Sequence, residues 1–500
     1  MNLKVTASFL LLIFFSTTAL AVSSESNNTS AESNHTSAES NNTSAESNNS
    51  SVHQDRRHNR TTTLVTTDDI GDEMFDIVIV VTNKLEKLKG DLSDLKASVE
   101  NYTKIDSAYF KQPVLIITEA VPSGRLIYTT TEPLQGRKGD VKTYANAAKK
   151  GIQRAVDAGC ERPLLVIPED GPYESTFIIL SALEILYVPY DLREVGHEYK
   201  VEMLGVWFKD LVKGSMIINM TRDVEVGRII ARDIATGDPE MMSPGQVEIY
   251  IREAFRGSDI QMEVLSDIDT LKKDYPMLAA VSRAANVVPR HRARLIYLEY
   301  IGSNNINTTL FLLGKGTTMD TGGVSMISQK KMSAEGKTGA AGVAGFMKVL
   351  SLLKPRHLKV VAVMAMVRNS VGEESFVVDE LITSRARGAV RITNTAASNL
   401  DVMGDVLCKM VGMAEQAVNP EMMSMPPLRQ HEISSIRKRC TVTIFASNVQ
   451  SLKIRALHPS IMRPYYTANS FPLRNRKLQN FISFKIRIFK KNFRIILSIK

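Results

Sequence analysis

Alternating apolar and polar runs divide the middle of the chain into strands and helices. Short runs rich in Val, Ile and Leu have the length and composition of buried strands; they cover residues 75–81, 113–117, 163–167, 295–300, 309–313 and 358–367. Between them, apolar residues at helical spacing predict helices over residues 144–158, 175–186 and 339–353. Because strands alternate with helices, the pattern predicts an α/β fold with a largely parallel sheet.

The amino terminus has the pattern of a secretory signal peptide over residues 1–21. Lys4 supplies the positive charge, residues 9–15 the apolar core, and Ala19-Leu20-Ala21 the small-residue cleavage site. The apolar run is short for a bilayer span, and no other stretch approaches that length. We therefore expect a secreted protein without a transmembrane segment; an uncleaved signal anchor is the alternative.

Residues 22–63 are dominated by a repeat of the type Ser-Ala-Glu-Ser-Asn-Asn-Thr, which runs to about Ser51. Apart from Val22, the repeat has no apolar residue larger than alanine, so it cannot bury a core and is expected to be disordered. It also contains repeated acceptors for N-glycosylation, which predict a glycosylated stalk in an exported chain. The candidate sites are Asn27, Asn28, Asn34, Asn41, Asn42, Asn48, Asn49 and Asn59.

The net charge of +9 comes from the carboxy terminus. Residues 471–500 contain nine Lys or Arg and no Asp or Glu, which leaves the rest of the chain neutral. The charge therefore does not indicate a nucleic-acid-binding face on the folded part. The tail is either a surface that binds membranes or polyanions, or a solvated or non-native extension. The three cysteines are too few for a disulfide framework.

The most informative stretch is Leu313–Gly323, which follows an apolar run and contains four glycines, Lys315 and Asp320. We expect the strand over residues 309–313 to end here in a glycine-rich turn. Open α/β sheets bind ligands at the carboxyl ends of their strands, and glycines let the backbone approach a ligand closely. The alternative is a plain strand-to-loop turn with a solvated lysine and aspartate.

Two short motifs resemble the leucyl (cytosol) aminopeptidase family. Gly314-Lys315-Gly316 followed by Asp320-Thr321-Gly322-Gly323 is similar to the first metal-binding motif of that family. Residues 391–398 lie where the family has its second motif, and Gly339-Ala340-Ala341 resembles the helix between the two. The resemblance covers residues 75–457.

The resemblance implies an amino-terminal α/β domain over residues 64–220 and a zinc-peptidase-like catalytic domain over residues 221–457. Beyond these, the basic tail of residues 458–500 departs from the family, so the second domain is expected to be incomplete. The family forms hexamers, and the missing portion makes a homo-oligomer doubtful for this chain.

The family removes amino-terminal residues from peptides with two divalent metals, manganese or zinc. The resemblance assigns Lys315 and Asp320 as metal ligands, and Glu335 lies one position from a third. Three further ligand positions and both catalytic positions of the family are replaced in this chain. Two-metal hydrolysis needs several carboxylates to hold the ions, so these replacements predict weak metal binding. The replaced ligand positions are Gly336, Ala396 and Ser398, and the replaced catalytic positions are Ile327 and Leu400.

Few other residues offer replacement ligands. Asp401 and Asp405 follow the second motif, while His431 and His458 lack any metal-binding spacing. The sequence thus predicts an aminopeptidase-like protein with impaired or absent activity. The alternative is a secreted, non-catalytic glycoprotein with a binding or structural role.

Overall fold

A computed structural model of the protein describes residues 62–82, 84–130, 141–168, 172–196, 199–306, 308–326, 334–396, 399–418, 440–445 and 496–498. The predicted signal peptide, the eight candidate glycosylation sites, Ile327, Ser398, His431 and His458 lie outside these residues, as do the side chains of Glu335 and Leu400. The described chain forms two compact units. Unit 1 comprises residues 1–260 and 344–355, and unit 2 comprises residues 261–343 and 356–500.

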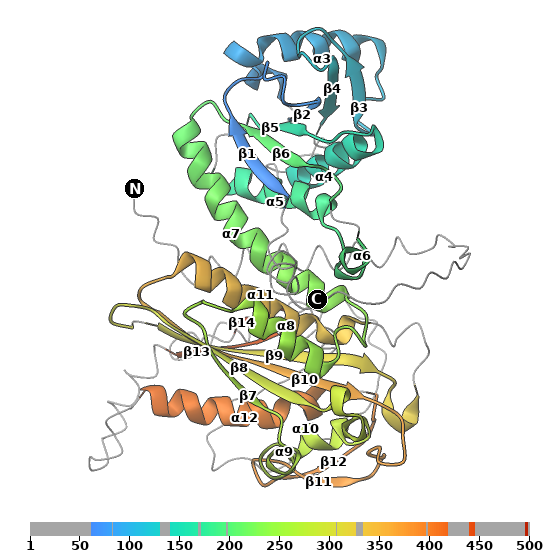
Figure 1. The fold of residues 1–500 in the computed structure, drawn as a ribbon, viewed down its shortest axis with the longest axis vertical. Coiled ribbons are helices and arrows are strands. Elements are labelled where there is room, and N and C mark those ends of the chain that lie inside the picture. Colours follow the sequence, from blue (N-terminus) through green and yellow to red (C-terminus); the bar gives the residue numbers. More distant parts are fainter. Residues whose placement is uncertain are drawn as a thin grey trace, which may run out of the picture. The chain divides into compact units, whose positions relative to one another are not determined.

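Unit 1 is built on a six-stranded sheet with the order β1-β6-β5-β2-β4-β3 (Figure 1). Only the pair β3–β4 is antiparallel. The strands are β1 (Thr63–Thr67), β2 (Ile77–Val81), β3 (Val114–Ile117), β4 (Arg125–Thr129), β5 (Pro163–Val166) and β6 (Met203–Trp207). The largely parallel sheet agrees with the sequence prediction, as expected when helices connect the strands.

Helices cover both faces of this sheet. Ile77 and Ile79 of β2 belong to one apolar core, and Val78 and Val80 to the other, because successive strand residues point to opposite faces. The helices of the unit are α3 (Ser93–Ile105), α4 (Val141–Asp157), α5 (Pro172–Leu186), α6 (Tyr190–Glu194), α7 (Leu211–Thr236) and α8 (Pro244–Ala254), with short 3₁₀ turns η1 (Leu85–Lys87) and η2 (Gly90–Leu92).

Helix α7 is continuous across the predicted boundary between residues 220 and 221. Its amino terminus is capped by Asp210, whose side chain accepts a hydrogen bond from the Lys213 N–H at 3.1 Å. Gly227 lets it approach another part of unit 1, because a Cβ there would lie 2.5 Å from the Gly345 carbonyl oxygen. The helix therefore belongs to unit 1 along its whole length.

The same helix contains a buried charged network. Glu225 accepts hydrogen bonds from Arg228, at 2.7 Å, and from Arg232. Asp233 accepts from the hydroxyls of Tyr187 (2.8 Å) and Tyr250 (2.6 Å). The four charged α7 side chains are each at most 3% exposed. Ion pairs and hydrogen bonds within the network therefore take the place of contacts with water.

Unit 2 contains a second six-stranded sheet, with the order β14-β13-β9-β10-β8-β7, and a separate pair β11–β12 (Figure 1). The pairs β9–β10, β9–β13 and β13–β14 are parallel, and β10–β8 and β8–β7 are antiparallel. The strands are β7 (Gln261–Leu265), β8 (Arg294–Ile301), β9 (Thr308–Asp320), β10 (Leu358–Asn369), β11 (Leu381–Thr383), β12 (Ala389–Arg391), β13 (Cys440–Phe445) and β14 (Ile496–Ser498).

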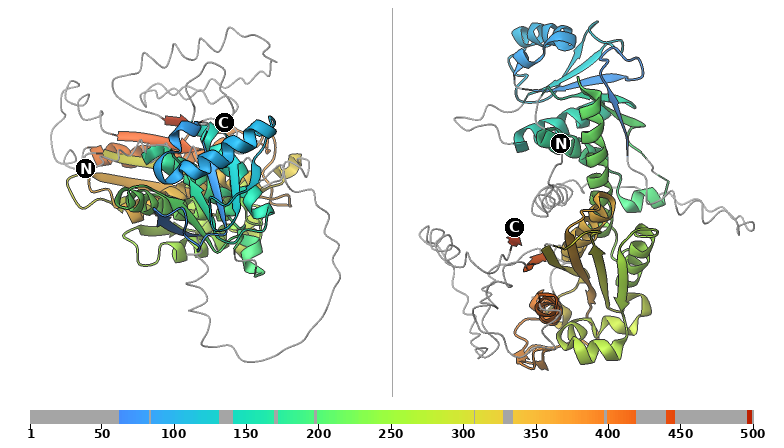
Figure 2. Two further views of the ribbon diagram at one scale, coloured as in Figure 1. Left: turned by 90° about the horizontal axis from the view of Figure 1, so that it is seen from above. Right: turned by 90° about the vertical axis from the view of Figure 1, so that its left-hand side faces the viewer.

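The helical segments that contribute to this unit are α9 (Ile268–Asp274), α10 (Pro276–Ser282), the first turns of α11 (Thr338–Leu353), α12 (Asn399–Val418), η3 (Ala285–Val287), η4 (Pro289–His291), η5 (Gly323–Ser325) and η7 (Ala334–Lys337). Helices α10 and α12 pack on one face of the sheet, where Phe311 and Leu313 join their core (Figure 2). Gly314 and Gly316 face α11 instead, close to Ala340. The face that lies towards α12 is the one that positions the candidate site.

The predicted end of the strand over residues 309–313 is wrong. Strand β9 does not end at Leu313; it continues through Gly314, Lys315 and Gly316 to Asp320, paired with β10. A Cβ at Gly314 would lie 2.6 Å from Ala340 Cα, so this glycine serves close helix packing rather than a turn. Strands β8 and β9 follow each other in the sequence, but β10 lies between them in the sheet.

The α/β fold class is confirmed in both units. None of the helices in the described ranges has the length and apolar character of a membrane span.

Candidate functional site

Lys315 lies inside β9 on the face that packs against α12. Its side chain is only 5% exposed, so the alternative of a solvated turn lysine is wrong. Burial lowers the pKa of Lys315, while the nearby carboxylates of Asp320 and Asp401 act in the opposite direction. The structure thus brings together the lysine of the first motif and an aspartate that follows the second.

Asp320 ends β9, and its carboxylate is already engaged by hydrogen-bond donors. Its Oδ1 accepts from the Asn369 side-chain amide at 2.7 Å and from the Gly322 N–H at 2.9 Å. Asn369 ends the neighbouring strand β10, is fully buried, and also donates to the Thr395 carbonyl oxygen at 3.0 Å. A carboxylate oxygen that accepts two N–H groups has less capacity left for a cation.

Thr395 connects the two predicted motifs. Its hydroxyl bonds to the Gly322 carbonyl oxygen (2.6 Å) and the Ser325 hydroxyl (2.8 Å), and accepts from the Ser325 N–H (3.2 Å). The turn that it holds depends on Gly322 and Gly323, whose φ angles are 84° and 57°. The two motifs, which are some seventy residues apart in the sequence, therefore lie side by side.

Asp401 and Asp405 have different roles on α12. Burial, with a smaller contribution from Asp405, raises the pKa of Asp401 to about 6, although Lys315 opposes the shift. Asp405 accepts hydrogen bonds from the backbone N–H groups of Met277 and Arg385, both at 2.8 Å. Asp405 thus has a structural role, because it holds two backbone segments. Asp401 is the α12 carboxylate that interacts electrostatically with Lys315.

The two replaced ligand positions that the structure describes, Gly336 and Ala396, supply no side-chain oxygen. Gly336 packs against β9 so closely that a Cβ would lie 2.5 Å from the Thr317 carbonyl oxygen. The Ala396 N–H donates a hydrogen bond to the side-chain oxygen of Asn394 at 2.8 Å. Lys337, next to Gly336, is completely buried and adds a second positive side chain to the turn that packs on β9.

The described residues alone do not make up a two-metal centre. A pair of dications needs several carboxylates around a shared oxygen, whereas the described residues contribute two carboxylates, Asp320 and Asp401, beside Lys315. Within the described ranges no group of three or more His, Cys, Asp or Glu is close enough to hold an ion. The donor set supports a buried lysine between two carboxylates instead.

Asn369 and Asp401 were not singled out as site residues from the sequence. Asn369 lies two residues beyond the mainly apolar run 358–367, so its only signal is a polar residue at the end of a buried strand. Asp401 was noted merely as a carboxylate near the second motif. Their positions depend on which strands are neighbours and on the direction of α12, which local patterns do not reveal.

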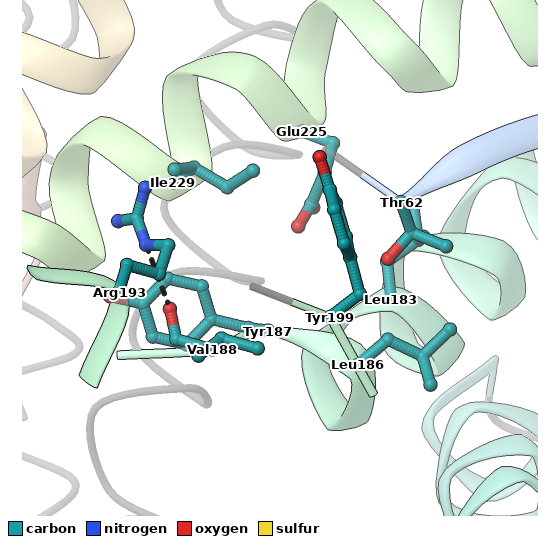
Figure 3. A pocket seen from close by; sticks show the side chains of 9 residues that line it. All are labelled: Thr62, Leu183, Leu186, Tyr187, Val188, Arg193, Tyr199, Glu225 and Ile229. Atoms are coloured by element: carbon teal, nitrogen blue, oxygen red, sulfur yellow. Dashed lines mark hydrogen bonds between the residues drawn. The ribbon is translucent and has the colours of Figure 1, made fainter. Parts of the chain in front are cut away.

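A small cavity in unit 1 is not a substrate site. Its lining includes Tyr187, Arg193 and Glu225, and Arg193 donates to the Val188 carbonyl oxygen across it (Figure 3). Its volume of about 20 Å³ holds one water molecule. Peptide-sized ligands need several hundred Å³.

Comparisons with known proteins agree with the motifs. Residues 229–426 match the model of the cytosol aminopeptidase family, catalytic domain. A Caenorhabditis elegans protein named as an aminopeptidase, W07G4.4, is 34% identical over 386 residues, covering 75% of this chain and 74% of the relative. A protein of Thioalkalivibrio sulfidiphilus named as a cytosol aminopeptidase is 29% identical over 40% of each chain.

Solved structures show the same fold. The apo structure of leucyl aminopeptidase from Trypanosoma cruzi superposes with a TM-score of 0.60 at 14% identity, covering 80% of this chain and 76% of that one. The bottromycin maturation enzyme BotP, in complex with Mn, gives a TM-score of 0.56 at 16% identity over 84% and 81% of the chains. The chain belongs to the cytosol aminopeptidase family, as a divergent member.

Proposed function

We propose that this chain is a secreted member of the cytosol aminopeptidase family that has lost the two-metal peptide hydrolysis of its relatives. The family origin supports a peptide-binding ancestry, and BotP, which was solved with Mn, makes manganese the first metal to test. The exported, non-catalytic protein then serves as a binding or structural module.

One observation carries this proposal. At the place of the first motif, Asn369 and Gly322 donate to one oxygen of the Asp320 carboxylate, and the Lys315 side chain lies near it. These hydrogen bonds take up acceptor capacity that a metal ligand would need. The protein itself thus satisfies part of the demand that a cation would meet at Asp320.

The surrounding backbone opposes simple restoration of the lost ligands. Gly336 has no space for a Cβ beside the Thr317 carbonyl oxygen, so an aspartate there would have to displace β9 or η7. Ala396 sits in a turn that Asn394 closes. The loss thus involves the shape of the site as well as its side chains.

The test combines metal analysis with turnover. The full-length secreted protein is equilibrated with Mn²⁺ or Zn²⁺, its bound metal is counted, and hydrolysis of a leucyl chromogenic amide is followed. We expect no stoichiometric metal and no turnover above that of the matched Asp320→Ala variant. Stoichiometric metal together with turnover that Asp320→Ala abolishes would contradict the proposal.

Secretion and glycosylation need a separate measurement. The leader and the repeated acceptors in residues 22–63 support export and sugar attachment. Intact-mass analysis of secreted protein, before and after removal of N-linked sugars, should show cleavage after residue 21 and several sugars. A full-length mass without sugars in a eukaryotic secretory host would reject this part of the proposal.

A further inference from the structure

Unit 2 has an open cleft of about 830 Å³ between α9–α10 and the β11–β12 hairpin. Asp405 bridges the two walls, because it accepts from Met277 N–H of α10 and from Arg385 N–H beyond β11. The lining includes none of Lys315, Asp320 and Asp401. An inference about this cleft is thus independent of the proposed function.

The cleft is lined by five basic and two acidic side chains. Both acidic residues are engaged by arginines: Glu380 by Arg283 at 2.9 Å, and Asp274 more loosely by Arg385 at 3.8 Å. The remaining basic residues, Lys272, Lys273 and Arg387, are exposed and have no ion-pair partner in the described part of the chain. The cleft therefore has an uncompensated positive rim.

The wall formed by β11 is also an unpaired strand edge. The hairpin bonds Ile392 N–H→Glu380 O and Ser384 N–H→Gly388 O fix which residues face β12. By the alternation of an antiparallel pair, the N–H and C=O groups of Leu381 and Thr383 point to the opposite edge. Leu381 and Thr383 both line the cleft, so this edge is open to a ligand there.

We propose that the cleft binds an extended acidic peptide segment of a partner protein, which adds to the outer edge of β11 as a third strand. The peptide backbone pairs with Leu381 and Thr383, and its carboxylates lie against Lys272, Lys273 and Arg387. Main-chain pairing supplies affinity in such complexes, while side-chain contacts supply selectivity. A compact phosphate would use the charges but leave the row of backbone groups unpaired.

The test uses fluorescence anisotropy of a labelled oligoglutamate peptide with the full-length protein at low salt. An oligoglutamine peptide of equal length is the control ligand and should not bind. Lys272→Glu/Lys273→Glu should weaken oligoglutamate binding by at least about tenfold. The matched variant Lys104→Glu/Lys111→Glu changes the net charge equally at exposed sites of unit 1 and should leave binding unchanged.

Strand addition is tested separately. Thr383→Pro removes an outward N–H without removing a β11–β12 hydrogen bond, and it should abolish binding. An oligoglutamate peptide N-methylated at alternate residues makes the same test without altering the protein, and it should not bind. Binding that survives N-methylation, that tripolyphosphate displaces completely, or that both double variants weaken equally would overturn the proposal in favour of unspecific polyanion attraction.

Discussion

The two units compensate their buried charged groups to different degrees. In unit 1, Glu225 pairs with two arginines, and Asp233 accepts from two tyrosines and Arg193. Burial disfavours the charge on Arg193, but Asp233 outweighs it and raises the Arg193 pKa. In unit 2, burial prevails at Lys315, whose pKa falls, and at Asp401, whose pKa rises to about 6.

The difference separates a structural network from a candidate functional cluster. Direct pairing offsets much of the burial cost in the α7 network, although burial still lowers the pKa of Arg228. The charges around Lys315 are held at a cost that the fold does not fully offset. Groups with such perturbed pKa values are common at functional sites, and the family membership gives this cluster an origin in catalysis.

The largest effect is expected when the α7 network is broken. Glu225→Ala leaves Arg228 and Arg232 buried without their shared carboxylate and should destabilise the protein by about 3–5 kcal/mol. Urea unfolding provides the measurement. The control Glu248→Ala removes a pair whose Arg252 side chain is 54% exposed, and it should cost less than about 1 kcal/mol. Equal losses of stability in the two variants would show that the buried network stabilises the protein no more than an exposed ion pair does.

The opposite sign is expected at Asp401. Its folded pKa of about 6 lies above the ordinary 3.8, so the stability linked to its neutral form is complete below pH 3.8 and is lost as the pH rises through 6. Asp401→Asn keeps a neutral side chain and should stabilise the protein by about 2–3 kcal/mol above pH 6, with little effect below pH 3.8.

Urea unfolding across that pH range, in a chelating buffer, measures the Asp401 effect. A variant that is less stable than the wild type at neutral pH would mean that attraction between Asp401 and Lys315 exceeds the burial penalty. The site of unit 2 would then resemble the α7 network, and the contrast between the two clusters would disappear.

A smaller loss is expected from adding one methyl group beside β9. Gly336→Ala forces a Cβ to within 2.5 Å of the Thr317 carbonyl oxygen and should destabilise the protein by about 2 kcal/mol. Gly412→Ala on α12 meets no atom within 4 Å and should stabilise the helix by about 0.5–1 kcal/mol. Thermal unfolding of both variants compares the cost of a Cβ at the crowded Gly336 with its effect at the open Gly412.

The smallest effect is expected from metals. A ligand that binds only the folded state raises the melting temperature in proportion to its occupancy, so a site that holds no ion gives no shift. Millimolar Mn²⁺, Zn²⁺ or EDTA should leave the melting temperature unchanged. A rise with Mn²⁺ that Asp320→Ala abolishes would identify a working metal site in unit 2.

Local sequence patterns predicted the buried elements well. The apolar runs at residues 163–167 and 358–367 correspond to β5 and β10, and the helical spacing at 339–353 to α11. The predicted end of β9 was wrong because a glycine in a sequence usually indicates a turn. The packing partner that explains Gly314, Ala340, is more than twenty residues away in the sequence.

The sequence predicted only those residues of the candidate site that belong to the two motifs. Lys315, Asp320 and Thr395 were within those motifs, and the structure brings them together. The engagement of Asp320 by Asn369 depends on the register of β9 and β10, where Asn369 pairs with Asp320. That register and the position of α12 near Lys315 depend on long-range packing of the whole sheet, so local sequence patterns do not predict them.

Gly314 and Gly316 have a consequence for assigning activity from sequence. Side chains at these positions would collide with Ala340 and Met366, so steric fit alone explains both glycines in the absence of any reaction. Packing alone therefore accounts for the two glycines of this motif, because they let helix α11 lie close against β9. A prediction of activity must depend on the positions that only catalysis requires.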